Sequence, residues 1–220
     1  MEQLGLTFKT GRGGKRVGAG RKAMPRGRRH TPHRARPKHY AGHPVHVTLR
    51  ASVRSLRTQH VVRTVLGALR DSGRAGFRIA HYSVQANHLH LIVEAENKAE
   101  LSSAVRGLMV RVARRVNKLL FRRGRFWQDR WHGHTLTSPR QVRNALVYVL
   151  QNHRKHFVSS APALDTFSSA EWFNGFAQPL PKAFSSIGPP CVSAPRTWLL
   201  VTGWLRRGRI GLWEAPLTPS

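Results

Sequence analysis

The sequence has little of three things, and each shortage excludes a class of protein. Cys191 is the one cysteine in 220 residues, so neither a disulfide framework nor a cysteine-based zinc site is expected, and the predicted compartment is the reducing cytoplasm. No stretch approaches the roughly 18 uninterrupted apolar residues of a membrane span, and the N-terminus has no apolar signal core. Acidic residues are also scarce, with 9 Asp and Glu against 38 Lys and Arg.

This charge imbalance predicts a polyanionic partner. A formal net charge of +29 causes strong self-repulsion unless a polyanion neutralises it, which makes nucleic acid the leading candidate. An anionic membrane surface is the alternative, but the amphipathic basic helix or lipidation signal that it requires is missing from the sequence. We therefore expect a nucleic-acid partner and no membrane partner.

Composition divides the chain into three parts. Residues 1–42 are basic and rich in glycine, with too little apolar surface to fold alone, and we expect a disordered arm. Residues 43–156 carry regular apolar patterns and are expected to form one globular domain. Residues 157–220 are predicted to form a strap rich in proline and serine, followed by an appendage that contains tryptophan and arginine.

The apolar patterns of the central part predict the order strand, helix, strand, strand, helix, strand, helix. Two-residue alternation marks the strands and a 3.6-residue stripe marks the helices. The order predicts an α+β fold with a ferredoxin-like antiparallel sheet, a split βαβ unit with helices on one face, and an added C-terminal helix. The expected strands are at 43–50, 77–85, 87–94 and 131–137, and the second and third are predicted to form an antiparallel hairpin or a bulged continuation of one. The expected helices are at 52–71, at 98–120 and from Pro139 to about residue 156, with Ser138 as the N-cap of the last.

The strand at 87–94 carries the candidate metal ligands. Alternation places His88 and His90 on the face opposite the apolar residues of the core, so two imidazoles lie side by side at a spacing that suits a divalent metal. The competing interpretation is a solvated strand face with two ordinary histidines. His132 and His134 repeat the spacing without a hydrophobic residue between them, and we expect them to be structural or to face DNA.

The last predicted helix carries a candidate nucleophile. Tyr148 and Asn152 are four residues apart and share a helix face, so a helix packed near the histidines would add a phenol and an amide oxygen to the site. Such a set can attack a phosphodiester, with metal polarisation of the phosphate. Gln151 is the alternative third ligand. Tyr148 is otherwise an ordinary amphipathic-helix residue, and Asn152 a solvent-facing or capping group.

A basic stretch follows the second predicted helix and continues into a loop that contains aromatic residues. Phosphate contacts and base stacking both suit this composition. A solvated helix face is the alternative for the helical cations, but the continuation into an aromatic-containing basic loop favours contact with DNA or RNA. The candidate nucleic-acid-binding residues are Arg111, Arg114, Arg115, Lys118, Arg122, Arg123, Arg125, Trp127 and Arg130.

Together these residues resemble a known family, the HUH single-tyrosine transposases, in the branch of the REP-associated tyrosine transposases with an IS200-like domain. The resemblance covers about residues 43 to 156. It is carried by His88-Leu89-His90, by His46-Val47-Thr48, by Asn87, by Trp127-Gln128, and by Tyr148 with Asn152.

The resemblance implies an activity and its cofactor. Tyr148 would attack single-stranded DNA at palindromic, hairpin-forming ends to give a 5′-phosphotyrosine and a free 3′-hydroxyl, with Mg²⁺ or Mn²⁺ held by His88, His90 and Asn152. Either a monomer or a homodimer is compatible with it. Two rivals remain, a catalytically inactive hairpin-binding protein or regulator on the same fold, and an RNA-binding ferredoxin-like domain, which is disfavoured because Phe77 and Tyr82 alone offer stacking rings on the central strands.

Overall fold

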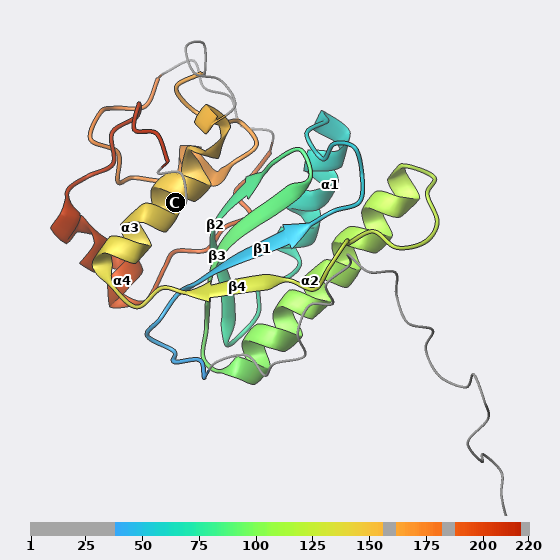
Figure 1. Ribbon diagram of the computed structural model, residues 1–220, viewed down its shortest axis with the longest axis horizontal. Helices are drawn as coiled ribbons and strands as arrows, with labels where there is room; N and C mark the ends of the chain where they lie inside the picture. Colours follow the sequence, from blue (N-terminus) through green and yellow to red (C-terminus); the bar gives the residue numbers. More distant parts are fainter. Residues whose placement is uncertain (1–37, 156–161, 182–187, 217–220) are drawn as a thin grey trace, which may run out of the picture. The chain divides into compact units, whose positions relative to one another are not determined.

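The structure of the protein is a computed structural model that describes residues 38–155, 162–181 and 188–216, so most of the predicted arm at 1–42 lies outside the described residues. The α+β fold is confirmed, with the elements in the predicted order (Figure 1). Its elements are β1 (Val45–Arg50), α1 (Gln59–Arg70), β2 (Phe77–Val84), β3 (His88–Ala95), α2 (Lys98–Leu119), β4 (His132–Thr135), α3 (Pro139–Leu150) and α4 (Trp198–Val201), with short 3₁₀ helices η1 (Asn152–Lys155), η2 (Ser169–Trp172) and η3 (Gly203–Arg207).

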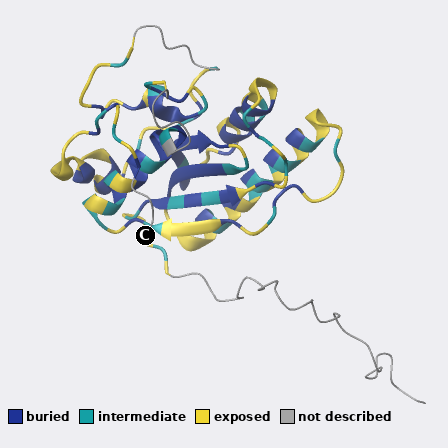
Figure 2. Ribbon diagram, turned by 45° about the horizontal axis from the view of Figure 1, so that its top comes forward, coloured by how far each residue is buried: buried dark blue, intermediate teal, exposed yellow. Residues whose placement is uncertain are grey.

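The four strands form one antiparallel sheet in the order β2-β3-β1-β4. Strands β2 and β3 form the predicted hairpin, in which the Gln85 amide donates to the His88 carbonyl at 2.8 Å. In the central pair, Thr48 lies opposite His90 and His46 lies opposite Ile92. Strand β4 is at the edge and is largely exposed (Figure 2). The register therefore places histidines of neighbouring strands on one face of the sheet.

Two hydrophobic cores lie on opposite faces of this sheet. Alternate residues of β1 and β3, among them Val47 and Leu91, pack with α1 and α2 in the first core. Ile92, which points the other way, packs with α3 and with residues from the end of the chain in the second core. Figure 1 shows α1 and α2 on one side of the sheet and α3 on the other. The helix that carries Tyr148 thus covers the histidine face.

Two predicted helix boundaries are wrong. The first helix begins at Gln59 instead of residue 52, because backbone N–H groups before it bind other segments: Ser52 donates to Phe126 at 2.8 Å and Leu56 donates to Ala86 at 2.6 Å. The last helix begins as predicted, with Ser138 as N-cap and Pro139 in its first turn, but ends at Leu150 instead of about residue 156.

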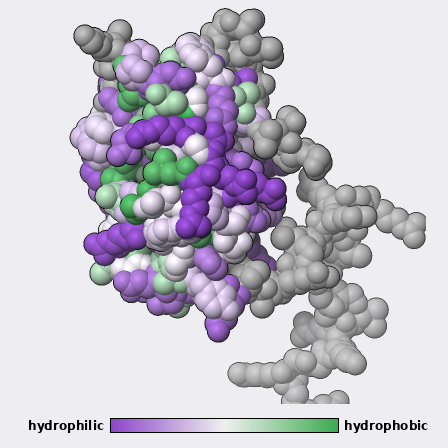
Figure 3. Space-filling model, turned by 90° about the vertical axis from the view of Figure 1, so that its left-hand side faces the viewer, coloured by the Kyte–Doolittle hydropathy of each residue, from purple (hydrophilic) through white to green (hydrophobic). Residues whose placement is uncertain are grey.

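The later part of the chain builds the second core. We call residues 162–181 and 188–216 the C-terminal segment. Several contacts join it to α3, among them a hydrogen bond from Gln151 Nε2 to the Gly211 carbonyl at 2.6 Å and an ion pair between Arg143 and Glu214 at 2.6 Å. The face seen in Figure 3 mixes strongly hydrophilic with hydrophobic side chains. The buried apolar residues that the C-terminal segment adds to the second core are Leu164, Ala170, Phe173, Phe176, Leu199, Leu200, Trp204, Ile210 and Leu212.

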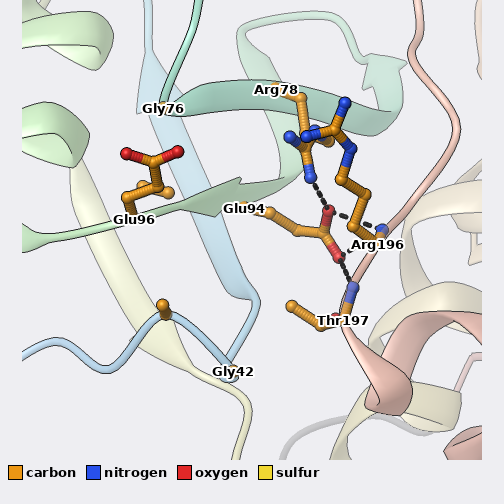
Figure 4. A pocket seen from close by; sticks show the side chains of 9 residues that line it. Gly42, Gly76, Arg78, Glu94, Glu96, Arg196 and Thr197 are labelled. Atoms are coloured by element: carbon orange, nitrogen blue, oxygen red, sulfur yellow. Dashed lines mark hydrogen bonds and ion pairs between the residues drawn. The ribbon is translucent and has the colours of Figure 1, made fainter.

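A buried acid fixes the segment to the sheet. Glu94 at the end of β3 forms an ion pair with Arg78 at 3.3 Å and accepts hydrogen bonds from the backbone amides of Arg196 and Thr197 (Figure 4). The Glu94 carboxylate thus holds the chain before α4 through one ion pair and hydrogen bonds from two backbone amides. Among the helices that the structure describes, none is long and apolar enough to cross a membrane.

Candidate functional site

The histidine pair lies on β3 with its rings stacked. The His88 and His90 ring centroids are 5.8 Å apart, with an angle of 18° between the ring planes. His90 is buried and lies 3.3 Å from Thr48, measured from its Nδ1 to Thr48 Oγ1, whereas His88 is half-buried near the end of the sheet. The rigid strand therefore presents two parallel imidazoles, one deep and one accessible.

Tyr148 lies against this pair. Its ring centroid is 5.2 Å from that of His90 and 5.5 Å from that of His46, with edge-on geometry in both contacts. The tyrosine is half-buried on α3, between the second core and the exposed side of the helix. The structure thus brings together the phenol and the histidine pair that the sequence places 58 residues apart, counted from His90 to Tyr148.

His46 is a further member of the cluster that sequence reasoning did not assign to the site. Its ring centroid is 5.4 Å from that of His90, and its Nε2 is buried without a hydrogen-bond partner among the described residues. Burial lowers the pKa of His46 to about 4, with a further contribution from the nearby His134. The signal was present in the sequence, because His46 alternates with Val47 on a strand, but the pairing of β1 with β3 was needed to place it beside His90.

The electrostatics of the site favour neutral imidazoles. Burial lowers the pKa of His88, and the positive charge of Arg50 lowers it further. A neutral imidazole is the form that donates a lone pair to a metal. At neutral pH His46 and His88 are therefore in the neutral form that can bind a metal.

Asn152 and Gln151 differ in their surroundings at the end of α3. Asn152 is buried, and its Nδ2 has no hydrogen-bond partner among the described residues. Gln151 donates from Nε2 to Gly211 and accepts at Oε1 from Arg154 at 2.8 Å. Both ends of the Gln151 amide are therefore engaged elsewhere. The Asn152 amide keeps one atom without a partner, and rotation of the amide by 180° exchanges its N and its O at that position.

The side-chain types of the candidate ligands are ones that a divalent metal accepts. Two imidazoles and an amide oxygen would make a mixed nitrogen and oxygen ligand set for a divalent metal. Asn152, however, lies in η1 and not, as was predicted from the sequence, on the α3 face that carries Tyr148. Among the described residues, no three His, Cys, Asp or Glu side chains are grouped so that they could hold a metal. The candidate ligands here are two histidines and an amide, a combination that differs from such a group.

The predicted nucleic-acid-binding residues are not all brought to the tyrosine. Arg111 donates to Ser72 Oγ at 3.0 Å, and Arg115 forms an ion pair with Asp71 at 2.5 Å, so both are engaged with the end of α1. Both belong to α2, which packs in the first core on the face opposite α3. Direct contact between these two side chains and DNA at Tyr148 is therefore disfavoured.

The loop after α2 is basic but its tryptophan is not a stacking surface. Trp127 is 8% exposed and donates from Nε1 to the Met109 carbonyl at 2.9 Å. Its ring is used in the core, which argues against the predicted base stacking. Arg125 binds the carbonyls of Trp127 and Gln128 within the loop. Arg122 is half-buried. The exposed cations of the predicted set are Arg114, Arg115, Lys118, Arg123, Arg125 and Arg130, and of these Arg115 is held in the ion pair with Asp71.

His132 and His134 lie on β4, where both are exposed. His134 pairs with His46 across the strands, and His132 pairs with Thr48. Both thus extend the histidine face to the edge of the sheet. His134 also lines a cavity with Tyr148.

Comparison with known proteins identifies the family of this fold. The model of the family described as Transposase IS200 like (Y1_Tnp) matches residues 40–173, which is more than half of the chain. The chain belongs to the IS200-like transposase family. This match extends beyond the predicted domain into the C-terminal segment, where it ends at Phe173.

A solved structure supports the assignment at the level of the fold. The structure described as a REP-associated tyrosine transposase bound to a REP hairpin is 20% identical to this IS200-like chain and has a TM-score of 0.53. The alignment covers 64% of this chain and 84% of that one. A search of curated proteins found no significant match.

Proposed function

We propose that this IS200-like protein is a tyrosine transposase, which cleaves and rejoins single-stranded DNA at hairpin-forming ends through a 5′-phosphotyrosine intermediate. The observation that carries the proposal is the placement of the Tyr148 ring 5.2 Å from His90, which itself stacks on His88. A nucleophile beside a metal-binding pair is the arrangement that phosphodiester attack requires.

The proposed metal ligands are His88, His90 and Asn152, with Gln151 as the less favoured third ligand. The buried Nδ2 of Asn152 has no hydrogen-bond partner among the described residues, and rotation of the amide by 180° would put the oxygen in its place, which supports this ranking. The engagement of Gln151 with Gly211 and Arg154 supports it as well. Bound Mg²⁺ or Mn²⁺ would supply Lewis-acid polarisation of the scissile phosphate.

The proposed step transfers a phosphoryl group without net hydrolysis. The Tyr148 Oη loses its proton and forms a bond to phosphorus, while the bond from phosphorus to the 3′-oxygen breaks and that oxygen takes up a proton. The DNA then carries a free 3′-hydroxyl, and its 5′-phosphate is esterified to the tyrosine. Because one phosphate ester replaces another, the reverse reaction can rejoin a strand.

Two features support a hairpin-forming, single-stranded substrate. The solved relative was captured with a REP hairpin, and the net charge of +29 favours a polyanion. The exposed cations Arg114, Lys118, Arg123 and Arg130 are the proposed phosphate contacts.

The strand order β2-β3-β1-β4, with α1 and α2 together in one core, supports the ferredoxin-like assignment.

Covalent trapping tests the proposal. The full-length protein is incubated with a library of labelled single-stranded hairpins and Mn²⁺, then separated on a denaturing gel. We expect a protein–DNA adduct that Tyr148→Phe abolishes and that Tyr40→Phe retains, since Tyr40 is 53% exposed and outside the histidine cluster.

The same gel addresses the non-catalytic alternative. Retention of hairpin binding by the wild-type protein, without a Tyr148-dependent adduct on any hairpin of the library, would refute the transposase and establish a binding module.

A further inference from the structure

A cavity of about 630 Å³ opens beside Tyr148. It lies between the edge of the sheet, the part of α3 from Gln141 to Tyr148 and the end of the C-terminal segment, and His46 also lines it. Its volume falls within the roughly 300–1,000 Å³ that is typical of sites for small organic groups. A substrate that reaches the tyrosine thus meets a space large enough for one of its bases.

The walls of the cavity combine an apolar floor with a polar rim. Leu136, Ala145 and Val147 are buried and form the apolar part. His46 and His134 add flat imidazole rings from neighbouring strands. Apolar and aromatic surfaces of this kind favour a planar ring, because every nucleobase has a π face that stacks without regard to sequence.

One helix stripe supplies amide groups to the rim. Gln141, Asn144 and Tyr148 are spaced by three and four residues and share a face of α3. Gln141 Oε1 accepts from the Thr137 amide at 2.7 Å and from its hydroxyl at 2.9 Å, which fixes that side chain. Asn144 is exposed and lines the cavity. An asparagine amide carries both a donor and an acceptor, the combination that recognises the edge of a base.

The cation at the cavity is already paired. Arg143 binds both oxygens of Glu214, at 2.6 and 2.8 Å, and donates to the carbonyls of Gly208 and Arg209. Its charge is therefore neutralised by a carboxylate that also lines the cavity. This pairing disfavours a second phosphate in the space and favours an uncharged group.

We propose that this cavity receives one nucleobase of the single-stranded DNA, from a nucleotide next to the phosphate that Tyr148 attacks, and that Asn144 selects that base. The inference rests on the proposed function of the same site. It adds a source of sequence preference at the cleavage point that is separate from recognition of the hairpin.

The test measures adduct rates with full-length protein, Mn²⁺ and hairpins in which either nucleotide flanking the cleavage point is each of the four bases or an abasic site. We expect wild-type rates at one flanking position to differ at least about fivefold between the best and the worst base. Asn144→Ala should bring this ratio close to one. Gln59→Ala, which removes an exposed amide from α1, should leave the ratio unchanged.

A second variant fills the space. Ala145→Phe should slow adduct formation with every base at that position and slow it least with the abasic site. Circular dichroism checks its folding, and Asn144→Ala keeps the test decisive if Ala145→Phe is unfolded. In the cleavage-inactive Tyr148→Phe background, 2-aminopurine at the same position should change its fluorescence on binding, and Ala145→Phe should abolish that change.

The outcomes separate the two proposals. Adducts that form at equal rates with all four bases and the abasic site, or a base preference that Asn144→Ala leaves intact, would overturn the nucleobase pocket while the transposase stands. Absence of any wild-type adduct overturns both.

Discussion

Replacement of Leu212 by alanine tests whether the C-terminal segment holds the tyrosine helix. Leu212 is 4% exposed in the second core, next to Gly211, which accepts from Gln151 at the end of α3. Removal of a buried leucine side chain costs about 2–5 kcal/mol of unfolding free energy. Since whole domains have roughly 5–15 kcal/mol, we expect the variant to remain folded in the absence of denaturant.

The matched control is Leu66→Ala in α1. Leu66 is 5% exposed in the first core, on the other face of the sheet. The two variants remove the same atoms at equal burial, so urea unfolding should give similar losses of about 2–5 kcal/mol. Only their positions relative to Tyr148 differ.

The discriminating assays are amide hydrogen exchange and adduct formation. Leu212→Ala should increase exchange along α3 and lower the adduct rate of the folded protein, whereas Leu66→Ala should increase exchange in α1 and α2 and leave the adduct rate near wild type. Equal loss of adduct in both variants, or unchanged exchange in α3 of Leu212→Ala, would refute the separation into two cores.

Three further predictions concern pH, metal and charge. Burial lowers the pKa of His81 from the ordinary 6.5 to about 4. The unfolded state therefore takes up the proton first, and stability that is present above pH 6.5 falls by about 3 kcal/mol as the pH falls toward 4. Urea unfolding of His81→Leu should show a weaker pH dependence. His88→Ala should abolish the Mn²⁺-dependent adduct while the midpoint of thermal unfolding and most hairpin affinity persist; a collapse of folding would show that His88 is structural. Deletion of residues 1–40, which hold 12 Lys and Arg, should weaken DNA binding and flatten its salt dependence but preserve the adduct; loss of the adduct with binding intact would place the arm in the active site.

The local patterns of the sequence predicted much of the fold. Alternation along 87–94 separated Leu89 and Leu91 from His88 and His90, and the Ser138-Pro139 pair correctly marked the start of α3. These signals are local, because side-chain direction and capping depend on neighbours within a few residues.

The features that sequence reasoning missed depend on distant contacts. The end of α3 at Leu150 coincides with the binding of Gln151 to Gly211, 60 residues away. His46 joins the cluster through the pairing of β1 with β3. Trp127 resembled a stacking residue in a basic loop until its contact with Met109 placed it in the core. No spacing within one element reports on such contacts.

The attachment of Gln151 to Gly211 also bears on the order in which the protein is made. The sheet, with both candidate histidines, and the helix with Tyr148 have all been synthesised before Gly211 is added. At about 5–20 residues per second, the 60 intervening residues delay this contact by roughly 3–12 seconds. A nascent chain therefore carries its complete set of candidate active-site residues for several seconds before the tyrosine helix is fastened, and activity on DNA should arise late in synthesis.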